Sequence, residues 1–198
     1  MNKTIFILIF TLFICVNSVS AQFGISAGYT IGNINYDGKQ NMNGFQAGIS
    51  YDFHIQNEWY IYSGLSYSQF GRSNTVQKPL GKWQYAYSHG FLEIPIHATF
   101  VMEVLDDLNL FVSAGPKLSY ALFGTETLKK PDGSTNKIKF YDNNVSPFNV
   151  LAGFNLGAQY YKLRLKIGYD WGLLNQYSGM DSKMYNRGGF VVSLGYVF

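Results

Sequence analysis

Histidine, serine and carboxylate side chains are the groups in this sequence that could perform catalysis or hold a metal ion. The sequence contains three histidines, His54, His89 and His97. Glu93 and His97 are the best candidate pair, because residues four apart on a strand lie on the same face. Their Cα atoms would be about 13 Å apart at ~3.3 Å per residue, and a metal ion would need further ligands from other strands. We therefore expect no metal site, no cofactor and no catalytic residues, and we interpret these side chains as part of an interior polar network.

The predicted network consists of side chains on the polar faces of segments in which apolar and polar residues alternate. Its members are Asp52, Glu93, His97, Lys117, Arg164, Lys166 and Asp170. The acidic members balance the cationic ones, which suits an enclosed interior where charges must pair. The other residues of these polar faces are mainly glycine, serine and asparagine, which would leave room for the larger side chains.

Eight segments must position these residues, and each shows the period-2 alternation of a strand with two different faces. They span residues 23–31, 44–54, 59–67, 91–100, 108–120, 148–160, 163–171 and 188–198. The seventh is the clearest, because Leu163, Leu165 and Ile167 alternate with Arg164 and Lys166.

Alternation of this kind occurs in soluble β-sandwiches and in transmembrane barrels, which differ in where charge is placed. The outer face of a soluble sandwich carries charge freely, whereas charged residues make up only 14% of this chain. A closed eight-stranded barrel has an interior just wide enough to be filled by side chains, and lipid requires an apolar exterior. We predict an all-β fold, an eight-stranded antiparallel up-and-down transmembrane β-barrel.

The lengths of the connections agree with this prediction. The connections after the second, fourth and sixth segments are short. Those after the first, third, fifth and seventh are long, at roughly residues 32–43, 71–90, 123–147 and 172–187. All long loops would then leave the barrel at one end, as in outer-membrane barrels with short periplasmic turns and long extracellular loops.

Aromatic residues on the outward faces form two predicted girdles, one for each membrane interface. The girdle near the short turns contains Phe23, Phe53, Trp59, Phe100, Tyr160, Tyr196 and Phe198. The girdle near the long loops contains Tyr29, Phe45, Tyr67, Tyr120, Phe148, Tyr169 and Trp171.

The N-terminus predicts export. A lysine, an apolar run over residues 4–16 and the small residues of "VSA" before Gln22 form a secretory signal peptide, too short to span a membrane. We expect residues 1–21 to be the signal peptide, cleaved after Ala21, and residues 22–198 to be the barrel domain. Cys15 lies inside the signal peptide after Ile14, where a lipoprotein would need a small residue, so we expect no lipidation.

The C-terminus is an alternating strand that ends on an aromatic residue. Its large apolar residues all lie on the outward face: Phe190, Val192, Leu194, Tyr196 and Phe198. This strand must close the barrel against the first one. A terminal aromatic residue also resembles the signal that the outer-membrane barrel insertion machinery reads, which makes that machinery an expected partner during biogenesis.

The mature chain resembles the PorT-like outer-membrane β-barrel family of Bacteroidetes over nearly its whole length. The resemblance is carried by "GFQAGISYDF", "YIYSGLSYSQFG", "FLEIPIHATF", "LFVSAGPKLSY", "FNVLAGFNLGAQY", "LRLKIGYDWGLLN" and "FVVSLGYVF". The segments "LEIP" and "AGP" are the more specific ones. The resemblance implies an outer-membrane location and, from the founding member, a role in supporting protein secretion. A shared fold is weak evidence of shared activity.

The predicted loops carry ten lysines and arginines against five acids. The cations are Lys39, Arg72, Lys78, Lys82, Lys129, Lys130, Lys137, Lys139, Lys183 and Arg187; the acids are Asp37, Glu126, Asp132, Asp142 and Asp181. The phosphates of lipopolysaccharide in the outer leaflet would attract this end of the barrel, although loops also carry charge for solubility alone. Nucleic-acid binding is not supported, because the lysines form no basic stripe with stacking aromatic residues.

We therefore predict a small, monomeric, non-enzymatic integral protein of the outer membrane with an envelope or interaction role. Outer-membrane lipids and lipopolysaccharide are its expected partners. The first alternative is an accessory of protein secretion that binds secretion components. More distant alternatives are a narrow channel and a lipid-modifying enzyme, for which Ser66 and His89 are the only candidates near the outer rim.

Overall fold

The computed structural model describes residues 21–35, 39–79, 81–141, 145–177 and 186–198. In these residues the chain forms nine strands: β1 (Ala21–Asn35), β2 (Lys39–Gln56), β3 (Trp59–Lys78), β4 (Gly81–Leu105), β5 (Leu108–Lys129), β6 (Thr135–Lys139), β7 (Phe148–Tyr160), β8 (Leu163–Gly172) and β9 (Asn186–Val197). The predicted signal peptide lies almost wholly outside the described residues, so its cleavage after Ala21 stays a prediction. No helix in the described ranges is long and apolar enough to cross a membrane.

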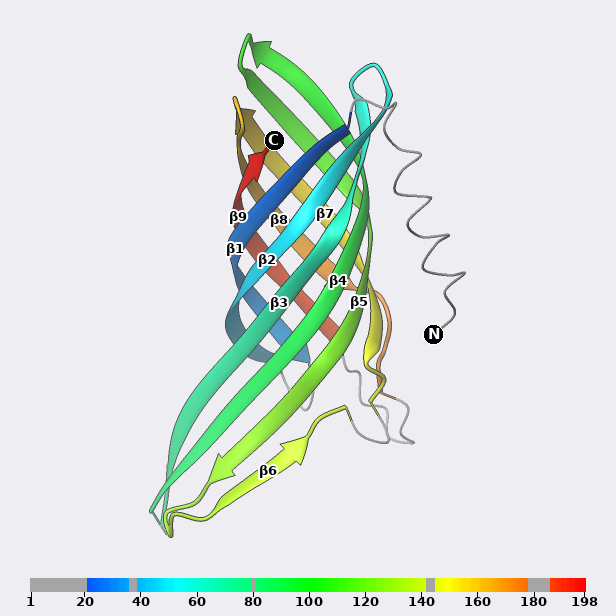
Figure 1. Cartoon of the computed structure of the whole chain (residues 1–198). Helices are drawn as coiled ribbons and strands as arrows, with labels where there is room; N and C mark the ends of the chain where they lie inside the picture. Colours follow the sequence, from blue (N-terminus) through cyan, green and yellow to red (C-terminus); the bar gives the residue numbers. More distant parts are fainter. Residues whose placement is uncertain (1–20, 36–38, 80, 142–144, 178–185) are drawn as a thin grey trace, which may run out of the picture.

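Eight of the strands close into a ring, which confirms the predicted barrel (Figure 1). The order around the sheet is β4-β3-β2-β1-β9-β8-β7-β5, and pairing of β4 with β5 closes it. Every pairing is antiparallel. β6 stands outside the ring, because it pairs only with the far part of β5.

The alternation in sequence becomes an apolar exterior and a polar interior. On β8 the outward residues Leu163, Leu165 and Ile167 are exposed, whereas Gly168 and Asp170 on the other face are buried. Such a large exposed apolar surface would be unfavourable in water, and it is the surface that a lipid bilayer requires.

The aromatic residues of the predicted girdles lie next to one another on neighbouring strands. At one end, the ring centroids of Trp59 and Phe100 are 5.3 Å apart and those of Phe23 and Phe198 are 5.6 Å apart. At the other end, Tyr29 faces Phe45 across β1 and β2. Residues of one girdle therefore sit at a common level of the barrel.

The end of the barrel with the short connections, here called the turn end, has turns of two residues. β2 and β3 are joined by residues 57–58, β4 and β5 by 106–107, and β7 and β8 by 161–162. Asn57 and Tyr161 adopt φ angles of 51° and 50°, the left-handed conformation that such tight turns need. Backbone hydrogen bonds also join neighbouring hairpins here, as from Tyr161 N to Asp107 O at 3.0 Å.

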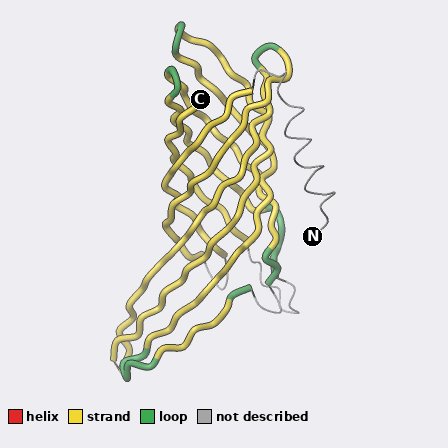
Figure 2. Tube along the Cα trace, in the orientation of Figure 1, coloured by secondary structure: helices red, strands yellow, loops and turns green. Residues whose placement is uncertain are grey.

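The opposite end, here called the loop end, differs from the prediction. The predicted loop at residues 32–43 is instead mostly a paired hairpin of β1 and β2. The predicted loops at residues 71–90 and 123–147 are in large part paired strands, because β3, β4 and β5 continue through them. Together with β6 they form a four-stranded sheet that projects beyond the ring, here called the extension (residues 72–78, 81–90, 123–129 and 135–139; Figure 2). The cause is local sequence: Trp83, Tyr85 and Tyr87 alternate with small or polar residues, the pattern of a strand.

Close approach of β2 and β3 leaves no space for a side chain at Gly44. A Cβ atom there would lie 1.8 Å from the backbone oxygen of Gln69, whereas at Gly71 its nearest neighbour would be 3.5 Å away. Gly44→Ala should therefore lower the free energy of unfolding by about 1–3 kcal/mol. Gly71→Ala, close by on β3, is the control, and it should be neutral or stabilising by about 0.4–1 kcal/mol. Urea unfolding in detergent measures both; equal midpoints would contradict the close approach.

Candidate functional site: the lumen of the barrel

Four buried charged side chains from four strands meet in the middle of the lumen. Glu93 on β4, Lys117 on β5, Asp170 on β8 and Arg187 on β9 form what we call the four-charge cluster. Lys117 Nζ lies 2.5 Å from Asp170 Oδ2 and 4.0 Å from Glu93 Oε2, and Arg187 donates to Glu93 Oε1. All four residues are at most 8% exposed. Buried charges persist only when paired, and this cluster is neutral.

Hydroxyl groups complete the coordination of the cluster. Ser68 Oγ donates to Glu93 Oε2 at 2.7 Å. Arg187 also donates to Ser119 Oγ at 3.1 Å. Serines of the polar faces thus form hydrogen bonds with the charged groups, in addition to leaving room for them.

Arg187 is the member of this cluster that the sequence analysis missed. The predicted loop over residues 172–187 contains it, but it lies on β9 and is 4% exposed. Its guanidinium carbon lies 4.0 Å from the ring centre of Phe91 and 5.2 Å from that of Phe70. The signal was present in the sequence, because Arg187 continues the inward series of Gly189 and Val191 by one more step. Including it changes the charge sum of the lumen from the predicted zero to +1.

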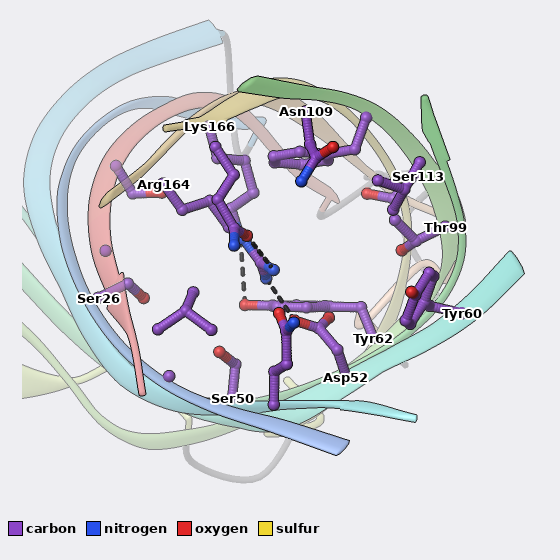
Figure 3. Close-up of a pocket in the computed structure, with 18 of the residues that line it drawn as sticks. Ser26, Ser50, Asp52, Tyr60, Tyr62, Thr99, Asn109, Ser113, Arg164 and Lys166 are labelled. Atoms are coloured by element: carbon purple, nitrogen blue, oxygen red, sulfur yellow. Dashed lines mark hydrogen bonds and ion pairs between the residues drawn. The ribbon is translucent and has the colours of Figure 1, made fainter. Parts of the chain in front are cut away.

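A second, smaller group of charges lies nearer the turn end. Arg164 donates to Asp52 Oδ2 at 2.6 Å and to Gln159 Oε1 at 2.7 Å. Lys166 donates to the hydroxyl of Tyr62 at 3.3 Å, and its Nζ lies 4.7 Å from the centre of that ring (Figure 3). Six of the seven predicted network residues therefore fall in two separate groups.

His97, the seventh, belongs to neither group. It is 1% exposed, and its Nδ1 lies 3.1 Å from Asn155 Nδ2. The candidate pair of Glu93 and His97 is joined by no hydrogen bond or ion pair in the described residues. Within these residues no three His, Cys, Asp or Glu side chains gather closely enough to hold a metal ion.

His89 and Ser66, the two candidates for an enzyme, point to different partners. His89 was expected in a loop, but it is a buried residue of β4 whose Nδ1 lies 3.2 Å from the Tyr141 hydroxyl. Ser66 Oγ lies 3.5 Å from the backbone oxygen of Glu93. These contacts do not assemble a nucleophile with a base.

An apolar cluster covers the four-charge cluster on the side of the loop end. Met42, Phe70, Phe91 and Ala121 are buried there, and Tyr87, Phe140, Tyr141, Val145 and Tyr177 pack against them. The lumen therefore has three layers. From the loop end, these are the apolar cluster, here called the apolar cap, then the four-charge cluster, and then a space near the turn end.

The extension carries a second candidate surface on its outward side. Cross-strand pairing places Lys82, Lys129, Lys137 and Lys139 on one face together with serine, threonine, glutamine and alanine. We call this surface the basic face; all four lysines are exposed, and it carries no acidic residue among the described strands. Along β4 it continues the outward face of Ile94 and Ile96, which lies against lipid.

The opposite face of the extension is aromatic. Trp83, Tyr85 and Tyr87 lie on it, and Tyr87 faces Glu126 across β4 and β5. Burial, and then the Glu126 carboxylate, raise the pKa of Tyr87 to about 12. Its hydroxyl therefore stays protonated and able to donate.

A closed ring of strands, an apolar belt with aromatic girdles and a paired polar lumen together define an integral outer-membrane β-barrel. The chain belongs to the family described as outer membrane protein beta-barrel domain, whose profile matches residues 17–178. No curated protein matches it in sequence.

Several solved outer-membrane barrels are similar in structure. The attachment invasion locus protein Ail of Yersinia pestis, solved with the heparin analogue sucrose octasulfate, is 16% identical with a TM-score of 0.49, covering 90% of this chain and 99% of Ail. Neisserial surface protein A is 15% identical with a TM-score of 0.46, covering 90% and 99%. The outer membrane enzyme PagL is 12% identical with a TM-score of 0.48, covering 87% and 98%.

Proposed function

We propose that this protein is a non-enzymatic envelope protein whose basic face binds the phosphate groups of lipopolysaccharide. The observation that carries the proposal is the position of Lys82, Lys129, Lys137 and Lys139. They occupy the outward side of strands whose segments within the ring contact lipid, with no acidic residue on the same face in the described strands. We infer that the anionic headgroups of the outer leaflet lie beside this face.

The proposed orientation places the turn end in the periplasm and the extension outside the cell, as in other outer-membrane barrels. The charges agree with it. The turn end carries Glu58, Glu103, Asp106 and Asp107 with one cation, Lys162, whereas the extension is rich in lysine. Ammonium groups make strong charge-assisted hydrogen bonds to phosphate oxygens.

The basic face can be tested by neutralising its four lysines together. Each lysine near an anionic surface contributes about 1 kcal/mol, roughly a five-fold change in affinity. The variant with all four lysines changed to glutamine should therefore bind lipopolysaccharide at least ~100-fold more weakly. Fluorescent lipopolysaccharide titrated onto the detergent-solubilised barrel measures this.

A matched pair of single variants serves as the control. Lys137→Gln should weaken binding about five-fold, whereas Lys162→Gln removes the same charge at the turn end, away from the basic face, and should not. Equal effects of the two single variants, or unchanged affinity of the four-lysine variant, would contradict the proposal.

A secretion accessory of the PorT-like type is the second candidate. The sequence segments that resemble that family favour it, and the acidic turn end would be the surface that meets periplasmic secretion components. A narrow channel fits less well, because the four-charge cluster and the apolar cap fill the lumen. A lipid-modifying enzyme fits less well because Ser66 and His89 have separate partners.

A further inference from the structure

The space near the turn end is a defined cavity of about 80 Å³. Its lining comes from all parts of the ring, and its charged lining residues are Asp52, Arg164 and Lys166 (Figure 3). A volume of this size holds several water molecules, or a small organic ion in their place.

The charges around this cavity do not balance. Asp52 is already paired with Arg164 at 2.6 Å. Lys166 has no carboxylate within 4 Å among the described residues, and its polar contact is the neutral hydroxyl of Tyr62. The four-charge cluster above is neutral in itself, so the surplus positive charge of the lumen resides at Lys166. A cation held in a narrow space of low dielectric attracts an anion.

An independent observation points to a missing partner in the same cavity. Thr99 lines the cavity and is 6% exposed, and its Oγ1 has no hydrogen-bond partner. Its side chain points into the cavity from β4 (Figure 3). Buried hydroxyl groups are almost always hydrogen-bonded, so this one indicates that something polar occupies the space.

We propose that the cavity is a binding site for a small carboxylate anion that enters from the turn end. Lys166 supplies the compensating charge. The hydroxyls of Tyr62 and Thr99 donate hydrogen bonds, directly or through an ordered water. The Tyr62 hydroxyl can do so while it accepts from Lys166, because a phenol both donates and accepts. The four-charge cluster closes the cavity on the side of the loop end, so the anion binds and leaves through the turn end.

The test uses the folded full-length barrel in detergent micelles, with acetate as the probe. Backbone amide signals of Tyr62, Thr99 and Lys166 should shift with acetate and reach saturation, with sodium chloride keeping the ionic strength constant. Lys166→Met should abolish the saturable shift. Lys166→Arg keeps the charge and should retain it, as should Lys162→Met, which removes an exposed lysine from a turn at the same end.

A second variant keeps the test decisive if Lys166→Met does not fold. Thr99→Val preserves the shape and the charge but removes the donor, and it should weaken acetate binding several-fold. Shifts that rise linearly without saturation, or that persist equally in Lys166→Met, would overturn the proposal. So would saturation by chloride alone at the same midpoint, since that result shows a general counter-ion site.

Discussion

Replacing Glu93 with leucine is expected to lower the free energy of unfolding of the barrel by about 3–5 kcal/mol. Glu93 is the acidic partner of Arg187 and lies 4.0 Å from Lys117, and it is 2% exposed. Its removal leaves two buried cations facing the single carboxylate of Asp170. Removing one partner of a buried ion pair destabilises the fold because the remaining charge stays buried without a partner. Urea unfolding of the barrel in detergent, followed by the change in gel migration on unfolding, measures the loss.

A second substitution separates the charge effect from lost packing. Adding Arg187→Leu to Glu93→Leu restores neutrality, so the double variant should recover part of the stability, with a coupling energy of about 0.5–3 kcal/mol. Glu103→Leu, at an exposed position near the turn end, is the control and should stay within about 0.5 kcal/mol of wild type. An unfolding midpoint of Glu93→Leu equal to that of wild type would show that the cluster does not support the fold.

Changing Phe198 to alanine is expected to reduce strongly the amount of barrel that reaches the outer membrane, with a much smaller effect on the folded protein. Phe198 is 63% exposed, and its ring lies 5.6 Å from that of Phe23 and 5.1 Å from that of Tyr196. Such partial contacts contribute about 0.5–1.5 kcal/mol each. Its backbone hydrogen bond to Phe23 O at 2.8 Å does not depend on the side chain.

The comparison of two aromatic residues distinguishes an insertion signal from ordinary packing. Phe148→Ala removes another exposed, lipid-facing aromatic residue, which is 44% exposed and lies far from the C-terminus. Membrane fractionation should show normal levels of Phe148→Ala and depleted Phe198→Ala, while both refold in detergent. Similar levels of the two variants in the outer membrane would contradict an insertion signal at the C-terminus.

The ring of strands was predictable because each face of each strand meets one environment. Leu163, Leu165 and Ile167 face lipid, whereas Arg164 and Lys166 face the lumen. Apolar and polar residues therefore alternate regularly in the sequence. The positions of the short turns were predictable for the same reason, since the turns interrupt that alternation.

The extension was not recognised because its strands lie outside the lipid. In water, both faces of a strand can carry polar residues, so the contrast between faces is weak. Residues 72–78 contain an arginine, a serine, an asparagine and a glutamine, which are typical of loops. The alternating aromatic residues of β4 were the remaining indication of a strand.

The partners within the lumen could not be predicted because they are set by the register of distant strands. Arg164 meets Asp52 across 112 residues, and Arg187 meets Glu93 across 94. Which inward groups share a level depends on the shear of the closed barrel. The sequence predicted the inward faces of most of these residues, but the division into a neutral four-charge cluster and a cationic cavity emerged only from the closed ring.

We propose that this barrel is a self-contained envelope protein that acts through lipopolysaccharide. The most direct measurement is gentle detergent extraction of the native outer membrane, affinity capture of the barrel and mass spectrometry of everything that remains bound. We expect recovery of the barrel with lipopolysaccharide and no stoichiometric protein, and loss of that lipopolysaccharide from the four-lysine variant. Stoichiometric recovery of secretion components would contradict it and would assign the function to the acidic turn end.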